Sequence, residues 1–197
     1  MGPFNFRRKL EREPLAVTMS GVRMGERVLQ IGVNDPRLAG AIAAKAGLSG
    51  HAAMAVADQT AAERANQGAI EAGRLIDVHV TPLDRLPFPE HAFDVVIINA
   101  MDGLLDRLEE MPRTQLLREC RRVVRDGGRV VSIEAGPRAG LGALLRRGSH
   151  EPDSAYLASG GTVSALQTAG FRPVRLLAER EGYRFVEGLK TGNATVT

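Results

Sequence analysis

Residues 27–47 read RVLQIGVNDPRLAGAIAAKAG and contain an apolar run, a turn and an amphipathic segment in close succession. The run 27–31 has the continuous apolar character of a strand that is buried in a parallel sheet. The spacing of apolar residues over 36–46 predicts a helix. A strand that turns directly into a helix is the unit that places nucleotide-like ligands in α/β folds. This stretch therefore predicts the fold class and also where a ligand binds.

The turn between this strand and this helix has a single glycine. Gly32 follows the strand, while Asn34 and Pro36 occupy positions where further glycines are usual in such turns. Asp35 can cap the helix, Pro36 suits its first turn and Gly47 suits its end. The helix is therefore well delimited, but side chains occupy space in which backbone commonly approaches a ligand.

The rest of the chain alternates strand and helix patterns. Apolar runs predict further strands over 52–57, 75–80, 93–99, 129–134, 174–178 and 183–187. Amphipathic spacing predicts further helices over 61–72, 114–125 and 162–169, whereas residues 135–161 show no regular pattern. Repeated strand–helix units predict an α/β fold with a parallel sheet, helices on both faces and an antiparallel edge hairpin formed by the last two strands.

A chain of 197 residues fits a single hydrophobic core. We place one domain over residues 25–190, preceded by a basic arm or helix over 1–24 and followed by a disordered tail over 191–197. Residues 1–13 are polar and basic with a few apolar side chains. They form either a weak contact with an acidic or membrane surface or a leader packed over the domain edge. Their low apolar content favours the second alternative.

Composition excludes several kinds of site. Cys120 is the only cysteine, so no internal disulfide and no cysteine-based zinc site is expected, and the four histidines lack metal-ligand spacing. Aromatic residues make up only 4% of the chain, which disfavours base stacking and hence a nucleic-acid partner. No apolar run approaches the ~20 residues that span a bilayer, and no signal peptide is evident. We expect a cytoplasmic protein with a small-molecule substrate and no metal.

Polar residues follow the predicted parallel strands, at the positions where ligands bind in such sheets. Asp58 follows the second strand, and a carboxylate there can accept hydrogen bonds from both hydroxyls of a ribose. The same residue can cap the helix predicted over 61–72, and the two roles are compatible. We favour the ribose role.

Several segments together resemble class I S-adenosylmethionine-dependent methyltransferases of the small single-domain type. They are RVLQIG at 27–32, Asp58, LPFPEHAFDVVIINA at 86–100, LLRECRRVVRDGGRVVSIE at 116–134, and the C-terminal AGFRPVRL and GYRFVEGLK. The resemblance covers about residues 25–190 and is specific only in combination. It implies a three-layer Rossmann-like fold with a seven-stranded, mostly parallel sheet whose last strand is antiparallel. It also implies S-adenosylmethionine as the cofactor.

The resemblance further implies which residues contact this cofactor. The turn at Gly32 would line the methionine portion, Asp58 would hold the ribose, and the segment 82–84 would lie near the adenine. Asn99 and Ala100 would flank the methyl-transfer pocket. The complete expected set is Gln30, Gly32, Val33, Asn34, Asp58, Gln59, Leu83, Asp84, Asn99 and Ala100.

The chain departs from the family pattern at the ends of the first and third strands. Gln30 stands where an acidic residue is usual, and the segment 33–36 replaces a glycine-rich turn. Pro82 aligns with the acidic residue expected at the adenine, and Asp84 lies two residues further on. We therefore keep three hypotheses for the function. The first is a methyltransferase acting on a small or medium-sized acceptor, and the alternative is a non-catalytic binding or scaffold protein with weak or lost cofactor binding. The third is an α/β domain that binds another nucleotide, although the segment 34–36 offers no cradle for the pyrophosphate of a dinucleotide.

A general base is needed only if the methyl acceptor loses a proton. Asp102, after the fourth strand, and His150, in the irregular segment, are candidates for this role. Asp102 can instead cap a helix from Leu104, and His150 can be a surface residue. Glu134 ends the fifth predicted strand and either faces the pocket or pairs with an arginine at its rim. We interpret the arginines within 118–125 as the solvated face of their helix, with an anionic partner as the alternative.

Overall fold

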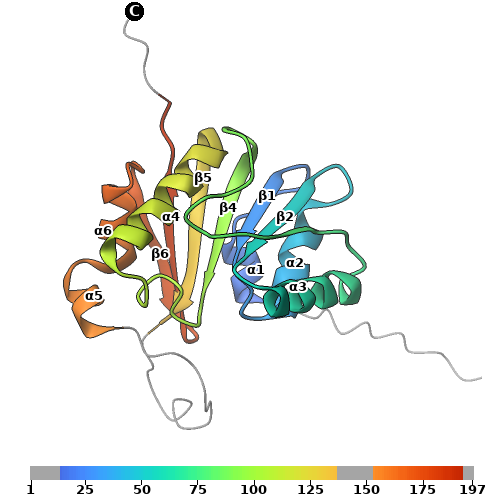
Figure 1. The fold of residues 1–197 in the computed structure, drawn as a ribbon, viewed down its shortest axis with the longest axis horizontal. Coiled ribbons are helices and arrows are strands. Elements are labelled where there is room, and N and C mark those ends of the chain that lie inside the picture. Colours follow the sequence, from blue (N-terminus) through green and yellow to red (C-terminus); the bar gives the residue numbers. More distant parts are fainter. Residues whose placement is uncertain (1–13, 137–152, 193–197) are drawn as a thin grey trace, which may run out of the picture.

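The computed structural model describes residues 14–136 and 153–192, which form an α/β fold of three layers (Figure 1). Its sheet has seven strands in the order β3-β2-β1-β4-β5-β7-β6. The strands are β1 Arg27–Ile31, β2 His51–Val56, β3 Asp77–Val80, β4 Phe93–Ala100, β5 Val124–Ala135, β6 Val174–Arg180 and β7 Tyr183–Leu189. The helices are α1 Leu15–Met19, α2 Pro36–Ala46, α3 Gln59–Glu71, α4 Glu110–Val123, α5 Ser154–Ala158 and α6 Gly161–Thr168.

The sheet is parallel except for its last strand, as predicted. β1 pairs in parallel with β2 and β4, β2 with β3, and β4 with β5. β7 lies between β5 and β6 and pairs antiparallel with both. The last two strands thus form the predicted edge hairpin. The carboxyl ends of β1, β2, β4 and β5 lie at one edge of the sheet, which we call the carboxyl edge.

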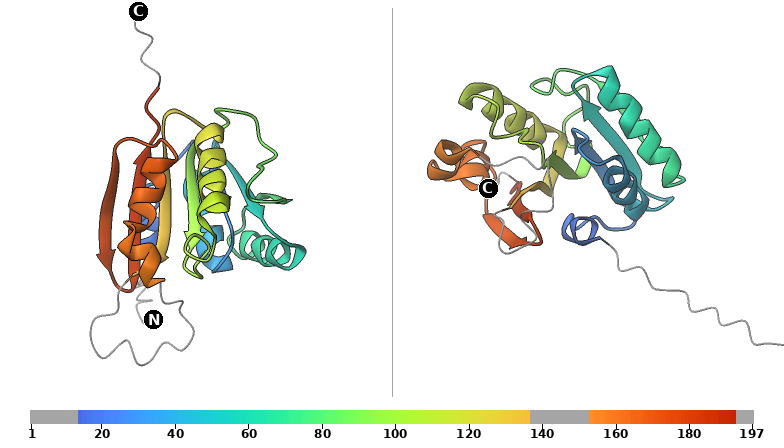
Figure 2. Two further views of the ribbon diagram at one scale, coloured as in Figure 1. Left: turned by 60° about the vertical axis from the view of Figure 1, so that its left-hand side comes forward. Right: turned by 90° about the horizontal axis from the view of Figure 1, so that it is seen from below.

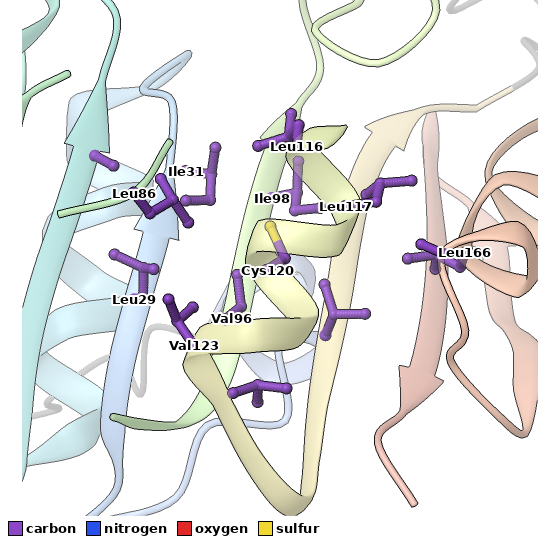
Figure 3. Close-up of a cluster of buried hydrophobic side chains, with 14 of the residues drawn as sticks. Leu29, Ile31, Leu86, Val96, Ile98, Leu116, Leu117, Cys120, Val123 and Leu166 are labelled. Carbon is purple, nitrogen blue, oxygen red and sulfur yellow. The ribbon is translucent and has the colours of Figure 1, made fainter. Parts of the chain in front are cut away.

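Helices cover both faces of the sheet (Figure 2). Buried residues of α4, α5 and α6 pack on one face, and those of α1, α2 and α3 pack on the other. Figure 3 shows part of the first face, where α4 presents Leu116, Leu117, Cys120 and Val123 toward the sheet. Burial raises the pKa of the Cys120 thiol to about 12, so this cysteine is a core residue and not a nucleophile.

The largest difference from the predicted elements concerns the start of β5. α4 begins at Glu110 and ends at Val123, and β5 follows without an intervening turn. The segment 126–128, left between the predicted helix 114–125 and the predicted strand 129–134, lies within β5 where its register with β4 shifts. Gly128 permits this irregularity, because a Cβ there would lie 2.7 Å from the carbonyl oxygen of Asp94.

Two short helices have bounds that the sequence did not indicate, and one of them, α1, lies in the segment predicted as a basic arm or helix. α1 and α5 have 5 residues each, too few to show a helical period in the sequence. α1 lies within the predicted arm, and its Ala16 and Val17 are buried in the core beside α2. Residues 1–13 of that arm, most of the irregular segment 135–161 and residues 193–197 of the predicted tail lie outside the described residues.

α2 and α3 pack against each other through two buried glycines, Gly40 and Gly68. A Cβ at Gly40 would overlap the carbonyl oxygen of Gly68, and a Cβ at Gly68 would overlap the carbonyl oxygen of Pro36. Both separations fall well inside the 3.0 Å that real Cβ atoms keep. Because Pro36 begins α2, this contact also sets the position of the turn between β1 and α2.

Candidate functional site

Two buried amide side chains join the ends of β1 and β4 at the carboxyl edge. Gln30 is 0% exposed, and its Nε2 donates a hydrogen bond to the carbonyl oxygen of Ala39 at 2.8 Å. Asn99 Nδ2 donates to the carbonyl oxygen of Gly32 at 2.9 Å and lies 3.5 Å from Gln30 Oε1. Gln30 and Asn99, both expected at the site, therefore lie together and hold the turn after β1.

The turn after β1 is held from three sides. Gly32 has a φ of 73°, in the left-handed region that favours glycine, and is held by β4 as described above. Asp35 caps α2 through its side chain, as predicted. Arg64 of α3 donates a hydrogen bond to the carbonyl oxygen of Asn34. The turn is therefore a defined structure in spite of its single glycine.

Asp58 lies at the carboxyl end of β2 and caps α3. Its Oδ1 accepts a hydrogen bond from the backbone N–H of Ala61 at 2.8 Å. The residue is exposed. The capping role weighed from the sequence is therefore present in the structure. The cap uses Oδ1, so it is compatible with a ligand hydroxyl on Oδ2.

The other expected cofactor contacts are presented in different ways. Gln59 begins α3 directly after the capping residue and is exposed. Val33 is buried in the core with residues of α3, so its side chain is not available to a ligand. Leu83 packs partly buried against the core, Asp84 is exposed, and Ala100 is buried at the end of β4.

The two candidate bases named from the sequence are not brought together with these residues by any described contact. Asp102 is exposed in a turn after β4. The alternative that it caps a helix from Leu104 is wrong, because residues 104–108 form turns and α4 begins at Glu110. His150 lies outside the described residues. A catalytic role for either residue stays a prediction.

A polar cluster surrounds Glu134 at the carboxyl end of β5. Glu134 pairs in register with Ala100 of β4 and with Arg184 of β7. The hydroxyls of Tyr156 in α5 and Thr162 in α6 are 2.8 Å apart, and both side chains are buried. The sequence did not indicate Tyr156 or Thr162. Tyr156 lies in the segment 135–161, which shows no regular pattern, and Thr162 lies in a helix that was predicted only from its apolar spacing.

Among the described residues, no arginine forms a salt bridge with Glu134. Its Oε1 is buried and makes no hydrogen bond in the part of the chain that the structure describes. Arg184 instead places its Nε 3.9 Å from Glu179 Oε2. Arg113 of α4 lies over the ring of Tyr156, with its guanidinium carbon 4.4 Å from the ring centroid. Of the two alternatives for Glu134, pairing with an arginine at the rim is therefore not observed within residues 14–136 and 153–192.

Burial raises the pKa of the Glu134 carboxyl above its ordinary value, and the neighbouring hydroxyls and Arg184 oppose this shift only in part. The folded state therefore binds this proton more tightly than the unfolded state. Its stabilising effect is present below the ordinary pKa and is lost as pH rises through the folded-state pKa. Each unit of pKa difference corresponds to about 1.4 kcal/mol.

We expect Glu134→Gln to remove this pH dependence. As pH rises from about 4 to about 8, the free energy of unfolding of the wild type should fall relative to that of the variant. Urea unfolding at a series of pH values measures this difference. Glu63→Gln, a change at an exposed position of α3, is the control and should track the wild type. A constant difference between wild type and Glu134→Gln would contradict the prediction.

A hollow of about 470 Å³ lies at the opposite edge of the sheet, where β4 and β5 begin. Its charged lining residues are Glu90, Arg118, Arg121, Arg122, Asp126 and Lys190. Arg122 is bound to Glu119 and to two backbone carbonyls, and Arg121 donates to the carbonyl oxygen of Gly170. These contacts correct the expectation of a purely solvated arginine face, because the fold itself uses both side chains.

Within residues 14–136 and 153–192, no group of three or more His, Cys, Asp and Glu side chains could hold a metal ion. In the same ranges, no helix is long and apolar enough to cross a membrane.

Comparison with known proteins relates this site to one family. The model of the methyltransferase domain family matches residues 29–132, which is more than half of the chain. The ubiquinone/menaquinone biosynthesis C-methyltransferase UbiE of Cupriavidus necator is 30% identical over 118 residues. That alignment covers 60% of this chain and 46% of the relative, so the chain matches less than half the length of this relative.

Solved structures share the fold at low sequence identity. A SAM-dependent methyltransferase from Aquifex aeolicus is 16% identical, with a TM-score of 0.66 over 87% of this chain and 86% of its own. A structure of PigF with SAH is 21% identical, with a TM-score of 0.60 over 84% of this chain and 51% of its own. These similarities support the three-layer fold with seven strands.

Proposed function

Because the chain belongs to the methyltransferase domain family, we propose that it transfers a methyl group from S-adenosylmethionine to a small or medium-sized acceptor. One observation carries this proposal. The turn after β1 is held by Gln30 and Asn99. The neighbouring strand, β2, is followed by the exposed carboxylate of Asp58. A constrained turn next to an acidic strand end is the arrangement that holds a nucleoside at the carboxyl edge of such sheets.

The described residues fit this cofactor. Gly32 has no side chain, which leaves space beside the turn. A Cβ at this position would lie 3.3 Å from Cδ2 of Leu104 and would crowd that side chain. Asp58 offers its exposed carboxylate to the ribose hydroxyls, and Leu83 with Asp84 is placed to flank the adenine. Asn99 and Ala100, at the end of β4, border the space for the methyl group. The cofactor supplies an electrophilic methyl group on a sulfonium.

The role of the chain in this reaction is positional. Methyl transfer is an in-line displacement, so holding the acceptor atom and the methyl group close and aligned supplies much of the acceleration. The buried amides of Gln30 and Asn99 suit this role, because their hydrogen bonds fix the turn to the rigid sheet. A base is required only for acceptors that lose a proton.

Isothermal titration calorimetry with S-adenosylmethionine and S-adenosylhomocysteine tests the proposal. We expect saturable binding of both ligands to the full chain. If millimolar ligand produces no heat of binding and no shift in the melting temperature of the protein, the methyltransferase proposal is contradicted.

Variants of Asp58 separate its two roles. Asp58→Ala should weaken cofactor binding by about 1–3 kcal/mol through loss of a charged hydrogen bond. It should also lower the free energy of unfolding by about 1 kcal/mol through loss of the helix cap. Asp58→Asn retains a capping side chain, so it should weaken binding while leaving stability near that of the wild type. Calorimetry and urea unfolding of the same samples measure both. Unchanged affinity in both variants would show that the ribose assignment is wrong.

The second candidate function is a methyltransferase-like binding protein that no longer holds the cofactor. The contact of Arg64 with the Asn34 carbonyl favours it, because this bond crosses from α3 to the turn beside the expected ribose position. The exposed carboxylate of Asp35 adds a negative charge there. Binding of S-adenosylmethionine by the wild type would exclude this candidate.

A further inference from the structure

Glu134, at the carboxyl edge, is not among the residues proposed to hold the cofactor. Glu134 carries a buried carboxyl oxygen, Oε1, that makes no hydrogen bond within the described residues. A buried carboxyl oxygen without a hydrogen bond is costly for a folded protein, so its presence needs an explanation. Its position relative to the proposed methyl-transfer pocket follows from its register on the sheet and from the packing of α5 and α6.

Glu134 lies directly beside the proposed methyl-transfer pocket. Its register partner on β4 is Ala100, the residue that borders this pocket in the proposed function. Neighbouring residues in register project to the same face of a sheet. Ala100 belongs to the core on the α4 side, so Glu134 lies on that face as well. Tyr156 and Thr162 approach it there from α5 and α6, and their hydroxyls are bonded to each other at 2.8 Å.

We propose that Glu134 is the general base of the reaction and that the acceptor is a molecule that gives up a proton from oxygen, nitrogen or an acidified carbon. This inference rests on the proposed function. The acceptor atom attacks the methyl carbon, the bond from sulfur to that carbon breaks, and its electron pair stays on sulfur as a neutral thioether. The proton lost by the acceptor passes to Oε1 of Glu134. The bond count and the charge therefore balance without a further reactant.

The environment of Glu134 strengthens its carboxylate as a base. Burial raises the pKa of its carboxyl, which makes the carboxylate a stronger proton acceptor than an exposed one. The charged groups that act on it are Arg184 of β7, which favours the carboxylate, and Asp106 of the loop after β4, which opposes it. Arg113 of α4 lies over the ring of Tyr156, and within the described ranges no cation forms a salt bridge with Glu134.

Sinefungin tests this placement without knowledge of the acceptor. In this compound a carbon bearing a protonated amine replaces the sulfonium and its methyl, so the amine stands where the transferred methyl would be. A carboxylate at Glu134 should attract this amine. We expect calorimetry to show that Glu134→Gln weakens sinefungin binding about tenfold while leaving S-adenosylhomocysteine binding unchanged, since about 1.4 kcal/mol corresponds to tenfold.

Two further variants complete the experiment. Glu134→Asp retains a carboxylate and should retain part of the preference for sinefungin, whereas Glu63→Gln at an exposed site should retain all of it. An unchanged ratio of the two affinities in Glu134→Gln, with S-adenosylhomocysteine still bound, would overturn the inference alone. Failure of the wild type to bind either ligand would overturn the proposed function and this inference together.

Discussion

Gly68→Ala should lower the free energy of unfolding by about 3 kcal/mol, at the upper end of the usual cost of overpacking. Gly68 is buried in α3, and an added Cβ would overlap the carbonyl oxygen of Pro36. This oxygen belongs to backbone, so it cannot rotate away as the end of a flexible side chain would. α2 and α3 must therefore separate. The intrinsic gain of about 1 kcal/mol from Ala over Gly in a helix does not offset this cost.

The same variant should weaken cofactor binding, because Pro36 begins the helix that follows the Gly32 turn. Gly73→Ala is the matched control. Its φ of 62° strains an alanine, but nothing lies within 4 Å of the added Cβ. It should therefore cost only about 1 kcal/mol. Urea unfolding and calorimetry measure both quantities, and a Gly68→Ala protein as stable as the control would contradict the described packing of α2 on α3.

Gln30→Glu should be nearly as costly, although an acidic residue is the one expected at this position from the family resemblance. Gln30 is fully buried and donates to the carbonyl oxygen of Ala39. A carboxylate has no proton to donate, so two oxygens would face each other at a position buried from the solvent. We expect a loss of about 3 kcal/mol at a pH of about 8, because a buried charged group is left unsatisfied.

The loss caused by Gln30→Glu should depend on pH. Burial raises the pKa of an introduced carboxyl, and the protonated form can donate to Ala39 as glutamine does. The deficit in stability should therefore grow as pH rises above the ordinary pKa of glutamate. Gln30→Met has a similar shape without charge and should show a smaller deficit that is independent of pH. An equal deficit for both variants at every pH would show that the hydrogen bond to Ala39 is unimportant.

The alternation of strands and helices could be predicted from the sequence because its signals are local. The apolar run at 93–99 became the central strand β4, and Asp35 caps α2 where the pattern places it. Element bounds failed where distant contacts decide them. The segment 126–128 has the composition of a turn, yet pairing with β4 and the close approach of Asp94 make it part of β5.

The candidate site was predictable only in part. Position at the end of a strand indicated Asp58 and Asn99, because parallel strands end at a common edge, whereas the family resemblance indicated Gln30. The role of Gln30 as a buried hydrogen-bond donor was not predictable, since its acceptor, Ala39, lies on the following helix. Tyr156 and Thr162 reach Glu134 only through the packing of α5 and α6.

The sequence by itself determined the fold class, the parallel order of secondary structure and the edge of the sheet at which a ligand is expected. These properties depend on apolar spacing, helix caps and strand ends, and each of these features involves residues that are close together in the sequence. Only the tertiary structure decided how a turn with one glycine is held and which carboxyl borders Ala100. Both depend on hydrogen bonds and strand register between elements that are far apart in the chain, so no local sequence pattern predicts these contacts.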